Sequence, residues 1–177
     1  MKTRPIFVLI LMLTLLAQGA CAPSAGACPT STSDTKLLMN KEDGYCLLYP
    51  AEDVSNTPGW VVIHPLLGPG EVPGEAWLYI QVQAAAGRAA AQIVDRGIAA
   101  LGEGFNISRF AVDVDGEQAI VVDGLPGQVS NRLVMIVHDD RLYTLTFQPW
   151  QPGAAGQTAL EDLYKTVMVS LHFLSKE

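Results

Sequence analysis

The sequence contains few of the residues on which catalytic and metal sites are built. It has three cysteines and three histidines among 177 residues, and only 16% of its residues are charged. His64, His138 and His172 lie far apart, with no cysteine or second histidine at the spacing of a metal site. No Gly-x-Ser-x-Gly elbow occurs, and the Gly-Glu-Gly at 102–104 follows a predicted helix instead of preceding one. We therefore expect no metal ligands and no cofactor.

Basic residues are also scarce. The chain has 11 Lys and Arg against 18 Asp and Glu, a net charge of −7. Residues 1–20 hold two of the basic residues and none of the acidic ones, so the remainder carries 9 − 18 = −9. An acidic surface disfavours nucleic acid and electrostatic adhesion to anionic lipid. The charge therefore predicts no nucleic-acid partner.

The long apolar run of the chain lies at its N-terminus. Residues 6–16 are apolar except for Thr14, and Lys2 and Arg4 precede them. The run has the length of a signal-peptide core and is too short for a comfortable transmembrane helix. The sequence therefore predicts a signal peptide over residues 1–20 and secretion across the cytoplasmic membrane.

The residues that follow, Gly19-Ala20-Cys21, resemble the bacterial lipoprotein signal, although Gln18 stands where that signal usually has leucine. The resemblance implies that Cys21 is diacylated, becomes the N-terminus and anchors the protein to the outer surface of the membrane. The alternative is ordinary cleavage near Ala20, which leaves Cys21 free. Under the first interpretation, the lipid anchor is the protein's only contact with the membrane.

Residues 21–35 are interpreted as a lipid-anchored tether. They contain no large apolar side chain, so they cannot bury enough surface to offset the entropy of ordering. If Cys21 carries lipid, Cys28 and Cys46 remain as an even pair in an oxidising compartment. They either form a disulfide or remain two thiols, with Cys46 as a small core residue.

Residues 36–177 have the length of one domain. Alternating apolar residues between turn signals predict strands at 35–40, 45–50, 59–64, 76–82 and 105–114, with a loop at 65–75. Residues 116–149 predict an antiparallel meander of three strands. Asp115-Gly116, Gly-Leu-Pro-Gly at 124–127 and Asp139-Asp140 are its turns.

Two stretches change to helical periodicity. Residues 87–102 predict one helix, ended by Gly102. A second follows Thr158, which forms a capping box with Glu161, and a short strand over 170–174 closes the chain. We expect both helices to cover the face of the last meander strand that carries Tyr143, Leu145 and Phe147. The helix residues expected there are Ile93, Ile98, Leu160, Leu163 and Val167.

This order of elements resembles the PsbP-like superfamily. The features that carry the resemblance are Gly-Tyr-x-Leu-x-Tyr-Pro at 44–50, the helix after about four strands, Leu-Tyr-Thr-Leu-Thr-Phe at 142–147, and Ser-Leu-x-Phe-Leu at 170–174. The resemblance implies an α+β fold, mainly antiparallel β-sheet flanked by two main helices in an α/β/α sandwich, and a non-catalytic role. It brings no ligand with it, because members of the superfamily bind unrelated partners.

Three features predict a binding surface. They are the long 65–75 loop, the polar connection at 123–131 followed by an arginine, and a tryptophan in a Pro/Gly linker. The residues taken from them are Leu67, Glu71, Asp123, Asn131, Arg132 and Trp150. The alternatives are a mobile loop, an irregular hairpin, and a tryptophan packed over the sheet edge.

Two groups of polar residues could carry chemistry. Asp113, Asp115 and Glu117 are interpreted as turn residues, with a metal site as the alternative. The best candidate for a catalytic group is His138 with Asp139 or Asp140, completed by a hydroxyl from Ser130 or Ser170. Adjacent strand residues point to opposite faces, so we expect that His138 and Asp139 do not meet.

The sequence therefore predicts a cell-envelope lipoprotein that is not an enzyme. Its single domain would act as a binding or assembly module, and its expected partner is another envelope protein. The alternative is an envelope enzyme, or an accessory subunit of an envelope enzyme complex.

Overall fold

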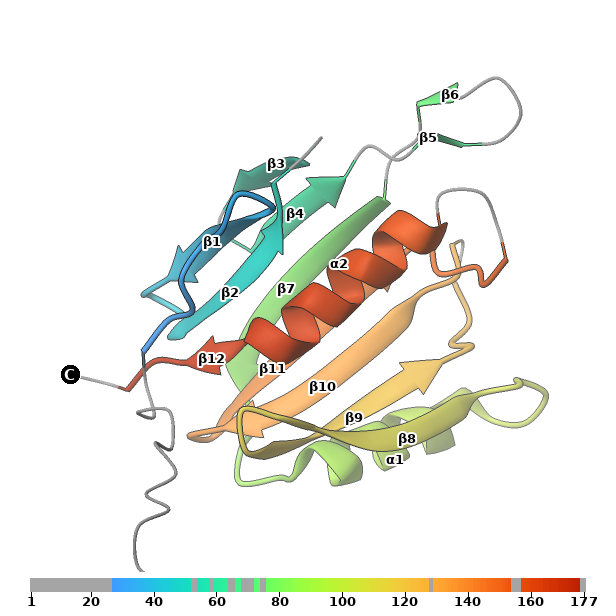
Figure 1. Ribbon diagram of the computed structural model, residues 1–177. Coiled ribbons are helices and arrows are strands. Elements are labelled where there is room, and N and C mark those ends of the chain that lie inside the picture. The colour runs from blue at the N-terminus through green and yellow to red at the C-terminus, as the bar shows by residue number, and fades with distance from the viewer. Residues whose placement is uncertain are drawn as a thin grey trace, which may run out of the picture.

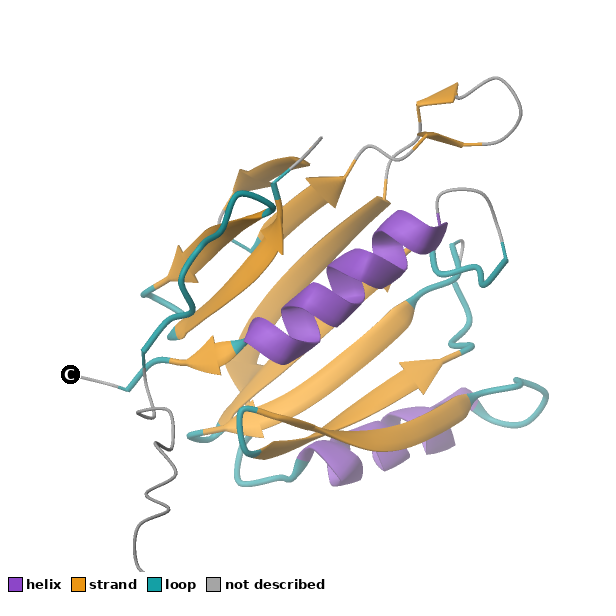
Figure 2. Ribbon diagram, viewed as in Figure 1, coloured by secondary structure: helices purple, strands orange, loops and turns teal. Residues whose placement is uncertain are grey.

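The computed structural model of the chain stacks a helix, a large sheet and a second helix (Figure 1). It describes residues 27–51, 54–57, 59–63, 66–67, 72–73, 76–127, 129–153 and 157–175. The predicted signal peptide and Cys21 lie outside these residues. Figure 2 shows the layers: helix α1 (Ala90–Leu101) lies on one face of the sheet, and helix α2 (Gln157–Ser170) lies on the other. The predicted fold class, α+β with a mainly antiparallel sheet and two main helices, is confirmed.

The strands agree with the predicted ones to within a few residues at most ends. In chain order they are β1 (Thr35–Asn40), β2 (Tyr45–Pro50), β3 (Val54–Thr57), β4 (Trp60–Ile63), β5 (Leu66–Leu67), β6 (Val72–Pro73), β7 (Ala76–Ala84), β8 (Ser108–Val114), β9 (Glu117–Asp123), β10 (Arg132–His138), β11 (Arg141–Gln148) and β12 (His172–Phe173). Strand β3 and the two-residue strands β5 and β6 were not predicted from the sequence.

The predicted meander forms β9, β10 and β11 of the large sheet, whose order is β3-β4-β7-β11-β10-β9-β8. Asp115 and Gly116 have φ of +53° and +81°, and Asp139 and Asp140 have +48° and +57°. Positive φ at both central residues is the geometry of a type I′ hairpin turn, which matches the twist of the strands that it joins. Aspartate adopts this left-handed conformation more readily than most residues.

Helix α2 covers the face of the sheet that holds the main core. Tyr143, Leu145 and Phe147 on β11 are each at most 2% exposed. They pack in one cluster with the apolar side of α2, as the sequence predicted for that helix. The buried α2 residues of this cluster are Leu160, Leu163 and Val167.

Helix α1 packs on the opposite face, so the prediction that both helices cover the Tyr143 face is wrong for α1. Its buried residues Ala90 and Val94 pack with Ile120 and Val122 of β9, and Ile98 lies beside them. Strands β9 and β10 are continuous apolar runs, so both of their faces are apolar. Their sequence therefore does not indicate which helix covers which face.

A small sheet of order β1-β2-β12 lies beside α2 over the same face of the large sheet (Figure 1). Tyr45 of β2 and Tyr143 of β11 make an edge-to-face contact with ring centroids 6.2 Å apart. The hydroxyl of Tyr143 donates a 2.9 Å hydrogen bond to the backbone oxygen of Asp43. These contacts fix the small sheet against the large one.

The end of the chain differs from its prediction at two places. Helix α2 begins at Gln157, so Thr158 lies inside the helix and is not the residue that caps it. Ser170, predicted to open the last strand, is the last residue of α2. Its hydroxyl donates a 2.5 Å hydrogen bond to the Thr166 carbonyl one turn earlier and accepts one from the Leu48 N–H, which joins the end of α2 to β2.

Candidate functional site

Arg132 is the centre of the first candidate site. Its Nε and Nη2 donate hydrogen bonds of 2.8 and 2.6 Å to the two carboxylate oxygens of Asp123. Its guanidinium carbon lies 4.0 Å from the ring centroid of Trp150, 4.9 Å from that of Tyr164 and 5.7 Å from that of Phe110. We call these five residues the Arg132 cluster. Paired hydrogen bonds and aromatic faces are the surroundings that a guanidinium prefers.

The electrostatics of the cluster favour the ion pair. Burial alone would lower the pKa of Arg132, but the hydrogen bonds and charge of Asp123 outweigh it and hold that pKa above its ordinary value. Burial also raises the pKa of Tyr164, an effect that the charge of Arg132 opposes. The arginine therefore stays charged and already has its partner, so the cluster stabilises the pairing of β9 with β10.

The structure brings together three of the six predicted binding-surface residues: Asp123, Arg132 and Trp150. It places Trp150 inside, at 7% exposure, and the backbone N–H of Trp150 donates a 2.8 Å hydrogen bond to the Ser130 carbonyl. The prediction of Trp150 as part of a binding surface is therefore not supported, because its side chain is buried although it lies in a Pro/Gly linker. Its ring is buried because it packs between Arg132 and Tyr164.

The other three predicted residues do not join this site. Asn131 is half-buried, and its side-chain oxygen has no hydrogen-bond partner within the described residues. Leu67 lies on β5, where only the backbone is described, and Glu71 lies outside the described residues.

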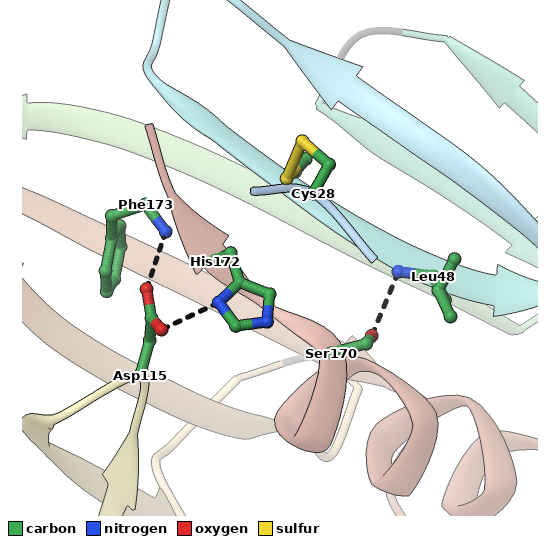
Figure 3. Close-up of a disulfide and its surroundings, with 7 residues drawn as sticks. Cys28, Leu48, Asp115, Ser170, His172 and Phe173 are labelled. Atoms are coloured by element: carbon green, nitrogen blue, oxygen red, sulfur yellow. Dashed lines mark hydrogen bonds and ion pairs between the residues drawn. A yellow bond between two sulfur atoms is a disulfide. The ribbon is translucent and has the colours of Figure 1, made fainter. Parts of the chain in front are cut away.

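Two histidine–carboxylate pairs lie at the turn end of the meander. Nδ1 of His172 is 2.7 Å from one carboxylate oxygen of Asp115, and the backbone N–H of Phe173 donates a 2.8 Å hydrogen bond to the other (Figure 3). Asp115 therefore fastens strand β12 to the β8–β9 turn. The neighbouring Asp113 accepts a 3.3 Å hydrogen bond from the Gly116 N–H within the same turn.

The second pair joins His138 of β10 to Glu117 of β9. Nδ1 of His138 lies 2.8 Å from the Glu117 carboxylate, and its ring stacks on Phe173 with centroids 4.4 Å apart. Nε2 lies 3.9 Å from the carboxylate of Asp139, so the expectation that these two neighbours do not meet is wrong. They come close because Asp139 is a turn residue with positive φ and does not follow the alternation of the strand.

The predicted catalytic group requires a serine hydroxyl within reach of His138. Asp140 accepts a hydrogen bond from the Gly87 N–H instead of binding His138. The Ser170 hydroxyl is held by Thr166 and Leu48, on α2 and β2. Within the described residues, no hydroxyl bonds to either His138 or His172.

Metal ligation is the alternative role of the acidic residues at 113–117. Over the described ranges, no group of three or more His, Cys, Asp or Glu side chains is arranged to hold a metal ion. Asp113, Asp115 and Glu117 each have a separate partner: the Gly116 N–H, His172 and His138. These three carboxylates therefore act in the turn and in the two histidine pairs.

A disulfide joins Cys28 to Cys46 of β2 and lies close to β12 (Figure 3). The Cα atoms of the two cysteines are 5.8 Å apart, and Cys46 lies opposite His172 in the small sheet. Of the two states left open by the sequence, the structure has the bonded one. The disulfide attaches the chain to β2 before β1 begins, so the stretch interpreted as a tether is fastened to the domain from Cys28 onward.

The second candidate site is a part of the large sheet on the α1 side. Helix α1 contacts β9 and β10, and on the same face β4, β7 and β11 carry half-buried and exposed side chains. Trp60 lies opposite Tyr79, which in turn lies opposite Thr146, and Gln81 lies opposite Thr144. We call this surface the open sheet face. Its members are Trp60, Trp77, Tyr79, Gln81, Gln83, Thr144 and Thr146.

The open sheet face is aromatic at one end and uncharged throughout these seven residues. Trp60 is 41% exposed, and its ring lies 4.6 Å from that of Tyr79. Gln81 and Gln83 are exposed, and the two threonines are half-buried. The alternation of β7 predicted a half-buried strand, but the sequence could not indicate that α1 stops short of it. A sheet face with one exposed and one half-buried aromatic ring beside neutral donors and acceptors suits a bound partner.

Neither α1 nor α2 combines the length and the apolar character needed to cross a bilayer.

Comparison with known proteins adds information about the fold alone. No protein-family model and no curated protein matches the chain. Among solved structures, it is similar to the solution structure of cyanobacterial PsbP from Synechocystis sp. PCC 6803, with a TM-score of 0.45 and 15% identity over 86% of this chain and 99% of that one. It is also similar to PA94 of Pseudomonas aeruginosa, a protein of unknown function, with a TM-score of 0.39 and 19% identity over 64% of this chain and 81% of that one. Both TM-scores lie below 0.5, so the PsbP-like resemblance stays a prediction from the order of the elements.

Proposed function

We propose that this chain is an envelope lipoprotein, anchored outside the cytoplasmic membrane through Cys21, whose domain binds another envelope protein without catalysing a reaction. The observation that carries the binding role is the open sheet face, where Trp60 is 41% exposed and packs against Tyr79. Tryptophan and tyrosine are enriched in protein interfaces and contribute much of their binding energy. The Cys28–Cys46 disulfide supports an oxidising compartment.

The polar groups elsewhere in the domain support a binding role over a catalytic one. Arg132 is paired with Asp123, His138 with Glu117, and His172 with Asp115. Each of these pairs joins two strands or fastens a strand to a turn, which is a structural use of the charge. Within the described part of the chain, the exposed side chains of the open sheet face form no such ion pair. An accessory role beside an envelope enzyme would use the same surface.

Site-specific photo-cross-linking in cells tests this proposal. A photoreactive amino acid at Gln81 lies within the open sheet face, and the same amino acid at Val169, which is 83% exposed on α2, is the matched control. We expect one protein to be captured from position 81 and not from position 169. The capture should be lost when Trp60→Ala or Tyr79→Ala is added. Equal capture from both positions, no capture, or capture that survives both substitutions would contradict the proposed binding face.

The nature of the captured molecule is a further check. Mass spectrometry that finds peptides of a second protein in the captured band identifies a protein partner, as proposed. A band that contains peptides of this chain alone, and that glycan-degrading enzymes return to the mass of the single chain, would show that the open sheet face binds a polysaccharide, and the proposed class of partner would be wrong.

A further inference from the structure

Strand β8 forms a free edge of the large sheet. It pairs with β9 on one side, and within the described residues no strand pairs with its other side. The Asp115-Gly116 turn makes Val114 and Glu117 a hydrogen-bonded pair. The backbone N–H and C=O groups of Val114, Val112 and Phe110 therefore point toward β9. The backbone groups of the intervening residues point outward. These residues are Arg109, Ala111 and Asp113.

The outward edge has the chemistry needed to pair with a copy of itself. Arg109 lies two residues before Ala111, and Asp113 lies two residues after it. An antiparallel pairing about a two-fold axis at Ala111 places each Arg109 opposite the partner's Asp113. Phe110 then lies opposite the partner's Val112 on the other face of the sheet. Opposite charges and apolar residues facing each other across strands stabilise such a pairing.

We propose that two copies of this chain associate through β8 in this register and form a dimer with one continuous antiparallel sheet. The pairing satisfies the outward backbone groups of three residues in each copy. It also covers Phe110, which is 43% exposed in the single chain. A long unpaired edge strand is the usual place for such addition.

The neighbouring elements leave room for the second copy. Helix α1 packs over β9 and β10, one strand or more behind the edge. The two α1 helices of the dimer would be separated by at least three strand spacings, roughly 14 Å, which exceeds the 8–10 Å between packed helices. In the single chain, Arg109 pairs with Asp95 of α1, and 45% and 54% of the two side chains are exposed. An exposed pair contributes little, so Arg109 remains available to the partner's Asp113.

The area of one strand pairing is smaller than that of a standard stable interface, so the dimer is expected to dissociate on dilution. A covalent trap detects it under these conditions. Ala111→Cys, in protein expressed from the full-length gene, places two thiols at the two-fold axis with Cα atoms about 5.5 Å apart, which a disulfide can span. Ser108→Cys is the control, because its symmetry mate lies six residues along the strand, roughly 20 Å away.

Charge exchange tests the register. Arg109→Glu and Asp113→Arg are introduced separately into the Ala111→Cys chain, and each places like charges opposite each other at both ends of the pairing. We expect each variant alone to reduce the covalent dimer by about 5- to 30-fold. In a mixture of the two, Glu at position 109 faces Arg at position 113, and the original Asp113 faces the original Arg109. Differently tagged chains should then regain the covalent dimer as the mixed species.

Three results would overturn the dimer. One is an Ala111→Cys protein that cross-links no more than Ser108→Cys. Another is a mixture of the two charge variants that recovers no more dimer than either variant alone. The third is wild-type protein that sediments with the mass of one chain at every concentration, which would leave β8 to pair with another protein. Thermal melting of each variant checks that a loss of dimer is not a loss of folding.

Discussion

Arg132 and Asp123 lie directly opposite each other on β10 and β9, and two parallel hydrogen bonds of 2.8 and 2.6 Å join them. They are the residues on either side of the connection at 124–131. The ion pair therefore closes that connection and fixes the register of the two strands. The same register brings His138 to Glu117 at the other end of the hairpin.

This relationship predicts how the domain responds when one partner is removed. Asp123→Asn should lower the free energy of unfolding by about 1–3 kcal/mol, because the guanidinium stays partly buried without its charged acceptor. Arg132→Lys should also destabilise, since an ammonium cannot form the paired hydrogen bonds or stack as well on Trp150. Urea unfolding gives both values. Asp95→Asn, which breaks the exposed Arg109 pair, is the control and should cost under about 1 kcal/mol.

Strand β11 provides a second prediction about stability. Phe147 is fully buried, and Phe147→Ala should cost about 3–5 kcal/mol through lost burial and the cavity left behind. Thr146 lies on the other face and is half-buried, so Thr146→Ala should cost well under about 1 kcal/mol. Melting curves of the two variants are compared side by side. Equal shifts would mean that the two faces of β11 are assigned incorrectly.

The disulfide is expected to stabilise the domain through the chain that it closes. Cys28 and Cys46 are 18 residues apart, and the chain-entropy estimate for such a loop is about 3 kcal/mol. Cys28→Ser should lower the urea midpoint, and a reducing agent should lower the wild-type midpoint to a similar value. The variant itself should not respond to the reducing agent. A wild-type midpoint that is the same with and without reductant would exclude this contribution.

The buried tyrosines predict a loss of stability at high pH. Burial raises the pKa of Tyr143 above 10.0, and burial likewise raises the pKa of Tyr45 and of Tyr164. A raised pKa means that folding favours the protonated phenol. This stabilisation is complete below the unfolded pKa of about 10 and is lost as the pH rises through the folded values.

The measurement is the melting temperature between about pH 8 and about pH 11. It should be steady at first and should fall once the pH exceeds about 10. Tyr143→Phe should make this fall shallower, although the variant starts from lower stability because it loses the hydrogen bond to Asp43. A wild-type curve that stays flat to the highest pH would contradict the prediction.

Anchoring is tested at Cys21, which lies outside the described residues. Cys21→Ser removes the thiol that carries the lipid, so the protein should leave the membrane fraction and should no longer incorporate a fatty-acid analogue. Cys28→Ser removes a cysteine of the disulfide and should leave both properties unchanged. A wild-type protein that is soluble and has an unmodified N-terminus would show that the lipoprotein interpretation is wrong.

Local sequence determined most of the secondary structure. Asp115-Gly116 and Asp139-Asp140 adopt the positive φ values that aspartate and glycine tolerate, so the two tight turns could be predicted. Gly102 ends α1, and the apolar residues of α2 recur at helical spacing and are buried. These features follow from neighbouring residues, whose backbone preferences act before any tertiary contact forms.

Tertiary structure decided which surfaces meet. The apolar residues of β9 and β10 line both faces of these strands. The sequence therefore does not indicate that α1 covers one face and α2 the other. Trp150 is buried because distant Tyr164 and Arg132 pack against it, and the partners of Arg132 and His138 depend on a register set across the 124–131 connection. The open sheet face lies beside α1 because that helix packs on β9 and β10. Each of these outcomes depends on contacts between segments far apart in the chain, and no local pattern in the sequence specifies them.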